Sequence, residues 1–481
     1  MTTSISHYYP TALPYAPPTR QWDIGRYISF LFILGIVSIP FILFGSLAQM
    51  PLLAAFPIAL GVLGLTAVKP EAGLLVMLIL MPMEDAMEVI PGSLTVIRTL
   101  GFFVLAVFLL HGLMGQGIVL NNPFIKRQSL LVLAMFVSIL LSNYPLAAMS
   151  GMQTQVAFLL FTILAISLIR DWRMVDNAIV FLFLGGVIAA VFGLWLEFTG
   201  AQSLASIERG GRLSLAEEAN PNAYSRAVGI CLVTMPYVWA RFRGPIIKAM
   251  LVFSAIFMIG AIIKAQTRSV WITLAAALPL AFWFAEPRIT ARAAKMLVMI
   301  TVVAVVLMVA VESGFIGEKI IKRFQTIEEG VHAGGRIDIW RVAFYAFLDN
   351  PLFGLGYGVF GYDSLNVASR HGLTLPGFYS RDVHNNYFFA LADLGLAGTL
   401  AFAALLWYLG KNLAIFPKGP LRGALIGMFI FDLLGGLTGT TINGKTFWFS
   451  VIVIAAAITV NARQKESTIL SESYTLEGSY V

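Results

Sequence analysis

One short segment holds the residue types that acid–base chemistry requires, namely Arg381-Asp382-Val383-His384-Asn385-Asn386-Tyr387. Histidine changes its protonation state near neutral pH, so it can accept a proton from a reacting hydroxyl. A lone histidine is often a capping or interfacial residue. The charged and amide neighbours of His384 instead favour a catalytic role, and we predict that His384 is a general base.

Basic side chains elsewhere are candidates for binding a phosphorylated group. Arg212 and Arg268 come first, because the arginine fork matches phosphate oxygens bidentately. Lys264 lies one helical turn before Arg268, and its alternative role is to reach the membrane interface with its amine. The secondary candidates are Arg336, Arg381, Lys264, Asn385, Tyr387 and Asp393.

Neither a metal ion nor another cofactor is expected. The acidic cluster of Glu84, Asp85 and Glu88 is interpreted as a solvated loop. His332 and His371 have no third group at a spacing typical of metal ligands. A metal-dependent reaction is therefore not predicted.

Three further charged residues need an interpretation. Asp393 and Asp432 fall inside predicted membrane helices, where carboxylates usually serve a function. We predict that Asp393 orients its helix through a buried hydrogen bond, whereas no motif surrounds Asp432. Arg226 is predicted to pair with Glu217 or Glu218 in a structural role.

The composition places these residues in a membrane protein. Of 481 residues, 58% are hydrophobic and only 12% are charged, against roughly 25% charged in soluble globular proteins. This balance excludes a soluble enzyme and a disordered chain. We expect an all-α polytopic protein with about fourteen, and at least twelve, membrane helices. The candidate spans are 27–47, 51–68, 71–83, 93–113, 129–148, 152–169, 175–198, 222–240, 245–264, 268–285, 295–312, 387–409, 421–439 and 446–461.

The distribution of lysine and arginine predicts the orientation. With a cytoplasmic N-terminus, most short inner loops are basic and the outer loops are mostly neutral or acidic. Both termini are then cytoplasmic, and the net charge of +7 needs no nucleic-acid partner. The predicted parts are a Pro-rich cytoplasmic tail (1–26), an N-terminal membrane bundle (27–312), a large periplasmic loop (313–386), C-terminal membrane helices (387–461) and a cytoplasmic tail (462–481).

The large outer loop is too long to be a mere connection, so function is expected there. Residues 335–349 are predicted to form an amphipathic helix lying on the outer membrane surface. Its apolar face carries Ile337, Trp340, Phe344 and Phe347. The glycines of 354–361 contain a formal G-x-G-x-x-G, but no strand precedes them, so they predict tight turns rather than a nucleotide site.

From His384 to Gly398 the chain follows the spacing H-N-x-Y-L-x-x-L-x-E-x-G-x-x-G, with Phe388 for Leu and Asp393 for Glu. This resembles the signature of the O-antigen ligase and Wzy-type polysaccharide polymerase superfamily. Further elements resemble the same family in the same order: Arg212 with Asn220-Pro221-Asn222-Ala223, then Thr267-Arg268-Ser269, then Arg336, Trp340, Ala343, Pro351 and Gly354-Leu355-Gly356. Together these matches cover about residues 212–398.

The resemblance implies a glycosyltransferase of GT-C-like helical architecture in the bacterial inner membrane, with its active site facing the periplasm. Such enzymes move a glycan from undecaprenyl pyrophosphate to an acceptor hydroxyl, with inversion and without a metal. By position, His384 would be the base, and Arg212 and Arg268 would contact the pyrophosphate. The implied partners are the lipid-linked glycan donor, a glycan or lipid A–core acceptor, membrane lipids, and a flippase and chain-length regulator.

Alternative functions remain at this stage. Within the family, the absence of a strongly basic outer loop favours a polymerase of surface or exported polysaccharide over a ligase acting on lipid A–core. A transporter or lipid-linked glycan flippase predicts midplane charges and internal repeats, and a membrane scaffold would not need arginine and histidine in an outer loop.

Overall fold

The computed structural model describes residues 51–86, 88–90, 94–115, 117–199, 212–215, 220–286, 288, 290–294, 301, 308, 312, 336–375 and 382–477. The chain divides into two units, residues 1–68 and 69–481, which are considered separately. The predicted tail 1–26 and span 27–47, nearly all of span 295–312, and Arg381 lie outside the described residues.

The first unit contains α2 (Pro51–Val68). The second unit is also helical, apart from one short hairpin. Its elements are α3 (Pro70–Leu80), the 3-10 helix η1 (Met81–Ala86), β1 (Glu88–Ile90), β2 (Leu94–Thr95), α4 (Val96–Leu113), α5 (Pro123–Leu140), α6 (Pro145–Leu168), α7 (Trp172–Phe198), α9 (Pro221–Val233), α10 (Met235–Arg241), α11 (Pro245–Lys264), α12 (Arg268–Ala285), α16 (Arg336–Asp349), α17 (Phe360–Arg370), α18 (Asn386–Ala414), α19 (Pro420–Gly436), η2 (Thr441–Asn443) and α20 (Lys445–Glu477). The strands β1 and β2 pair antiparallel.

Among the described residues, eight helices are long and apolar enough to cross a membrane: α4, α5, α6, α7, α11, α12, α18 and α20. This confirms an all-α polytopic membrane protein. The total of about fourteen spans stays a prediction. Helix α20 continues to Glu477, so part of the segment predicted as a cytoplasmic tail is helical.

Proline explains where the predicted boundaries differ from the structure. The span predicted at 129–148 is wrong in position, because α5 begins at Pro123 and α6 begins at Pro145. Proline suits the first helical turn, where its missing N–H is not needed. For the same reason the span predicted at 222–240 is two helices, since α10 begins just before Pro236.

Helix α18 is broken at Gly395, and the backbone of a distant loop supplies the missing hydrogen bonds. Gly395 has φ 61° and ψ −159°, which interrupts the helical hydrogen bonds. The carbonyls of Ala392 and Asp393 accept instead from Leu355 N (2.9 Å) and Gly356 N (3.0 Å). In return, the N–H groups at 396 and 397 donate to the carbonyls at 351 (2.8 Å) and 352 (3.0 Å). Four hydrogen bonds to the loop thus replace two lost helical hydrogen bonds, so these backbone N–H and C=O groups are paired at a buried site.

Asp393 also serves the next helix. Its carboxylate Oδ1 accepts a hydrogen bond from Phe360 N at 2.7 Å, at the first residue of α17. A carboxylate at a helix N-terminus is favoured by the exposed N–H groups and the helix dipole. Ser138 of α5 donates to the Asp393 carbonyl at 2.6 Å. One turn of α18 therefore connects α5, the glycine loop and α17.

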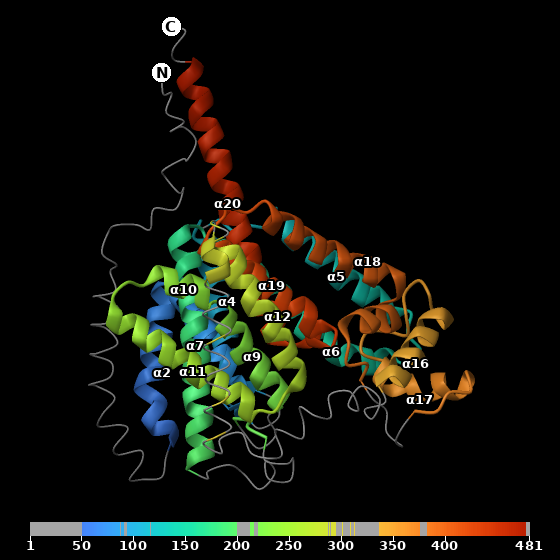
Figure 1. Ribbon diagram of the computed structural model, residues 1–481. Coiled ribbons are helices and arrows are strands. Elements are labelled where there is room, and N and C mark those ends of the chain that lie inside the picture. The colour runs from blue at the N-terminus through green and yellow to red at the C-terminus, as the bar shows by residue number, and fades with distance from the viewer. Residues whose placement is uncertain are drawn as a thin grey trace, which may run out of the picture. The chain divides into compact units, whose positions relative to one another are not determined.

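Helix α16 packs against α18 just beyond this loop (Figure 1). Its buried face consists of Ile339, Val342, Ala343 and Ala346. The predicted apolar face with Trp340 and Phe344 is a second face of the same helix. At the far end of α16, the Asp349 carboxylate lies 3.0 Å from His371 Nε2 of α17. The two outer helices are thus held to each other and to α18.

We predict that Gly395→Ala destabilises the protein. A Cβ at this position would lie 2.6 Å from three backbone atoms of residues 352–354, in a region of φ and ψ that is essentially restricted to glycine. The expected loss is at least about 1–3 kcal/mol, seen as a lower thermal midpoint in detergent. Gly361→Ala is the control, since its Cβ would meet nothing within 4 Å. Equal midpoints for both variants would contradict this account of the kink.

Candidate active site

His384 lies in a short segment directly before α18, in a strained backbone conformation. Its φ is +51°, which places a side chain with a Cβ in the left-handed region. The Asp382 carboxylate lies 3.7 Å from His384 Nδ1. The next residue, Asn385, caps α18 by accepting from Tyr387 N (2.9 Å) and Phe388 N (3.2 Å). The start of α18 therefore fixes the position of the base candidate.

Strain of this kind occurs at a second place close to the predicted arginines. In the part of the chain that the structure describes, Gln266 and His384 are the only non-glycine residues with positive φ. Gln266 stands directly before Thr267 and Arg268. Sparsely populated conformations cost free energy and concentrate at functional sites. One strained residue is the predicted base itself, and the other lies two residues before Arg268.

Arg212 is held by groups from two helix starts. Its Nε donates to the carbonyl of Ala265 at 3.1 Å. Its Nη2 donates to Asn222 Oδ1 of α9 at 2.7 Å and to Thr267 Oγ1 at 3.2 Å. These contacts join the two motif segments around Asn222 and Thr267, and they place Arg212 beside the start of α12.

Three other arginines bring positive charge to this end of the bundle. The Arg336 guanidinium, at the start of α16, lies close enough to Arg268 and to Arg226 for their charges to repel. Burial, together with the Arg268 cation, lowers the pKa of Arg336 from its ordinary value. Like charges held close together cost free energy unless an anion joins them. The arrangement is therefore suited to binding an anion.

The loop between α19 and α20, residues 437–444, supports both the base candidate and this charge cluster. Its Leu437 carbonyl accepts from Asn385 Nδ2 at 3.1 Å, and Thr440 Oγ1 donates to Asp382 Oδ1 at 3.1 Å. The carbonyl of Thr438, between them, accepts from Arg226 Nη2 at 3.3 Å. Groups flanking His384 and one arginine of the cluster thus share a single loop.

Helix α16 forms a second connection. The indole Nε1 of Trp340 donates to the carbonyl of Val383 at 3.1 Å, directly before His384. Trp340 stands one turn after Arg336, and its ring stacks on Phe388, one turn after His384, with the centroids 5.5 Å apart. The same pair of helices therefore positions a cation and the histidine.

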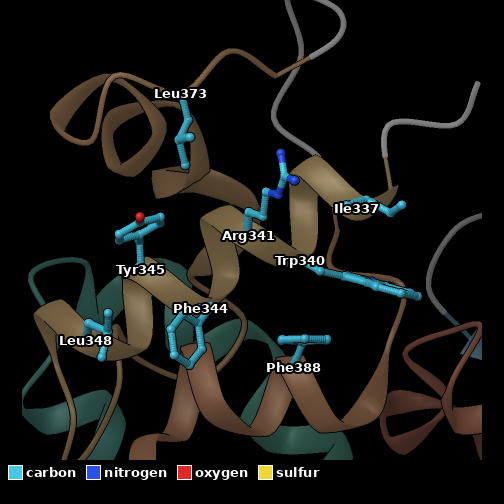
Figure 2. A pocket seen from close by; sticks show the side chains of 8 residues that line it. All are labelled: Ile337, Trp340, Arg341, Phe344, Tyr345, Leu348, Leu373 and Phe388. Carbon is cyan, nitrogen blue, oxygen red and sulfur yellow. The ribbon is translucent and has the colours of Figure 1, made fainter. Parts of the chain in front are cut away.

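An apolar groove of about 620 Å³ opens beside this stacked pair. Figure 2 shows the rings of Trp340 and Phe388 facing each other between α16 and α18. The other lining residues are Ile337, Arg341, Phe344, Tyr345, Leu348 and Leu373. The predicted apolar face of α16 thus lines this groove.

Three secondary candidates have contacts that connect helices. Lys264 Nζ lies 3.4 Å from Glu197 Oε1, which joins the ends of α11 and α7. The Tyr387 hydroxyl donates to the Leu433 carbonyl of α19 at 2.9 Å. Asp393 binds the start of α17, as described above. Each of these contacts joins two helices, and none of them links His384 to an arginine.

The prediction that the acidic cluster is a solvated loop was wrong at Glu84. This carboxylate is 7% exposed, accepts from Thr95 Oγ1 at 2.9 Å and forms an ion pair with Lys445 at the start of α20. A carboxylate and an amine far apart in the sequence neutralise each other there, which composition alone does not reveal.

Comparison with known families identifies the segment that carries most of these features. Residues 253–403 match the model of the family Wzy_C, described as O-antigen ligase. This segment is similar to the O-antigen ligases. The match confirms the resemblance to the O-antigen ligase and Wzy-type superfamily. None of the curated proteins searched matches the chain.

The matched segment contains Arg268, Arg336 and His384, together with the kink of α18. Arg212, Arg226 and the 437–444 loop lie outside it in sequence and are joined to it by the contacts above. The 437–444 loop was not among the predicted site elements. Its signal was the run Gly435-Gly436-Leu437-Thr438-Gly439-Thr440-Thr441, which is rich in glycine and hydroxyl groups and follows a predicted span.

We predict that the bond from Asn385 to the loop matters beyond helix capping. Asn385→Asp keeps the capping oxygen but removes the Nδ2 donor to Leu437 and places oxygen against oxygen. Asn385→Ala also removes the cap, at about 1 kcal/mol. Both variants should lose transfer activity, with α18 less stable only in the alanine variant. Full activity of Asn385→Asp in a membrane assay would contradict this role.

Proposed function

We propose that the protein transfers or polymerises an oligosaccharide carried on undecaprenyl pyrophosphate, at the outer face of the bacterial inner membrane. The observation that carries this proposal is that α16 and the 437–444 loop both contact the arginine cluster and the residues flanking His384. The match to the O-antigen ligase family supports a membrane glycosyltransferase of the ligase and polymerase class.

The proposed reaction needs a base and a fixed set of cations. His384 takes the proton of the acceptor hydroxyl as its oxygen bonds to the anomeric carbon. The bond from that carbon to the pyrophosphate oxygen breaks, and undecaprenyl pyrophosphate leaves with the electron pair. Arg268, Arg336 and Arg212 stabilise the growing negative charge or hold the groups that do so. In this proposal the anomeric configuration is inverted and no metal takes part.

The direction of the helices supports a site at the outer face. The ends of α11 and α19 and the starts of α9, α12, α18 and α20 are connected through the contacts of Arg212, Asn385 and Glu84. The lysine and arginine pattern assigns these same ends to the periplasmic side and both termini to the cytoplasm. A single orientation therefore satisfies the contacts and the charge rule.

Within this class we propose a polymerase of a surface or exported polysaccharide. Its partners are then the lipid-linked donor, a growing glycan as acceptor, a flippase and a chain-length regulator. The alternative is an O-antigen ligase that uses lipid A–core as acceptor. A glycan transporter or flippase is a more distant alternative.

His384→Ala should abolish glycan transfer. Loss of a general base lowers the rate by about 10²–10⁴-fold, while the variant should reach the membrane at wild-type level. The measurement is the turnover of a lipid-linked oligosaccharide by the purified protein. Wild-type turnover in this variant would exclude His384 as the base.

The product distinguishes the two family functions. The purified protein is given an undecaprenyl-pyrophosphate-linked repeat unit, with or without lipid A–core. A ladder of products without lipid A–core is expected of a polymerase. A single transfer that requires lipid A–core would overturn the polymerase proposal and establish the ligase.

A further inference from the structure

We propose that Arg226 binds the pyrophosphate of the donor, and that Gly439 positions its guanidinium for this contact. The proposal rests on the proposed function and extends it to a residue outside the matched segment 253–403. It replaces the structural role predicted for Arg226 from the sequence. Glu217 and Glu218, the partners expected there, lie outside the described residues.

Arg226 retains unused hydrogen-bonding capacity in a buried setting. Its Nη2 donates to the Thr438 carbonyl at 3.3 Å. Its Nε is buried and has no hydrogen-bond partner within the described ranges. Leaving a buried donor unsatisfied costs free energy, more so on a charged group. An acceptor supplied by a ligand would remove this cost.

The charge around Arg226 points to an anion. Arg226 is repelled by Arg336, and Arg336 is repelled by Arg268. In the described parts of the chain, neither Arg226 nor Arg336 has a carboxylate partner. Asn222, one turn earlier on α9, already holds Arg212. Three arginines from three segments, Arg226, Arg268 and Arg336, therefore lie close together, and a pyrophosphate offers enough oxygen acceptors to bind several of them bidentately.

Gly439 explains how Arg226 is held. A Cβ on this residue would lie 2.3 Å from Nη2, 2.4 Å from Nη1 and 2.7 Å from the central carbon of the guanidinium. Any side chain there would displace the charged group. The guanidinium thus lies directly on the loop that also binds the groups flanking His384. The loop thereby sets the position of Arg226 relative to the base.

The test measures binding separately from turnover, using the full chain in detergent. The probes are undecaprenyl pyrophosphate and undecaprenyl phosphate, which differ by one phosphoryl group. We expect Arg226→Ala to lower the preference for pyrophosphate by about 10–100-fold, the range for a hydrogen bond to a charged group. Arg226→Lys should restore only part of it, because lysine lacks the fork. Gly439→Ala should lower the same preference while the thermal midpoint changes little.

Two comparisons decide the interpretation. Arg98→Ala, at an exposed arginine of α4, should leave the preference unchanged. Glu217→Gln with Glu218→Gln should also leave it unchanged, and a loss equal to that of Arg226→Ala would establish the structural pairing instead. A wild-type preference in both Arg226 variants would overturn the proposal. Absence of glycan transfer by the wild type would contradict the proposed function, and the preference for pyrophosphate would still report on Arg226.

Discussion

The exchange of backbone hydrogen bonds at Gly395 holds the outer part of this protein together. Helix α18 gives up two of its own bonds, and the loop at 351–356 provides four in return. Only glycine tolerates both the conformation at 395 and the approach of another backbone, and Gly354 meets Asp393 from the other side in the same way. The loop directly follows α16, so this exchange determines where α16 meets α18.

The position of α16 in turn determines where the candidate site residues lie. Arg336 and Trp340 stand on one side of the junction, and His384 and Phe388 stand on the other. The 437–444 loop joins the same region from a third direction and binds Asn385, Asp382 and Arg226. Backbone exchange, a helix cap and one glycine-rich loop therefore position the histidine and the cations.

Much of the helical architecture could be predicted from sequence, because long apolar runs have few alternatives in a bilayer. The spans at 245–264 and 268–285 and the outer helix at 335–349 agree closely with α11, α12 and α16. Hydropathy misplaced α5, since Lys126 and Arg127 belong to the helix that begins at Pro123. It also could not show that α9 and α10 are separate.

Sequence motifs identified candidate site residues, but the tertiary contacts around these residues could not be predicted from the sequence. His384, Arg268 and Arg212 were chosen by residue type, and the structure connects their surroundings. The contact of Arg226 with the 437–444 loop could not be predicted, because it spans more than two hundred positions. Glu84 was predicted to be solvated, because its partner Lys445 lies near the other end of the chain.

The most direct test is an experimental structure of the full chain with undecaprenyl pyrophosphate bound. The account predicts that the two phosphoryl groups lie among Arg226, Arg268 and Arg336, on the side that faces His384. Pyrophosphate bound away from these arginines, with His384 remote from the carrier, would contradict it.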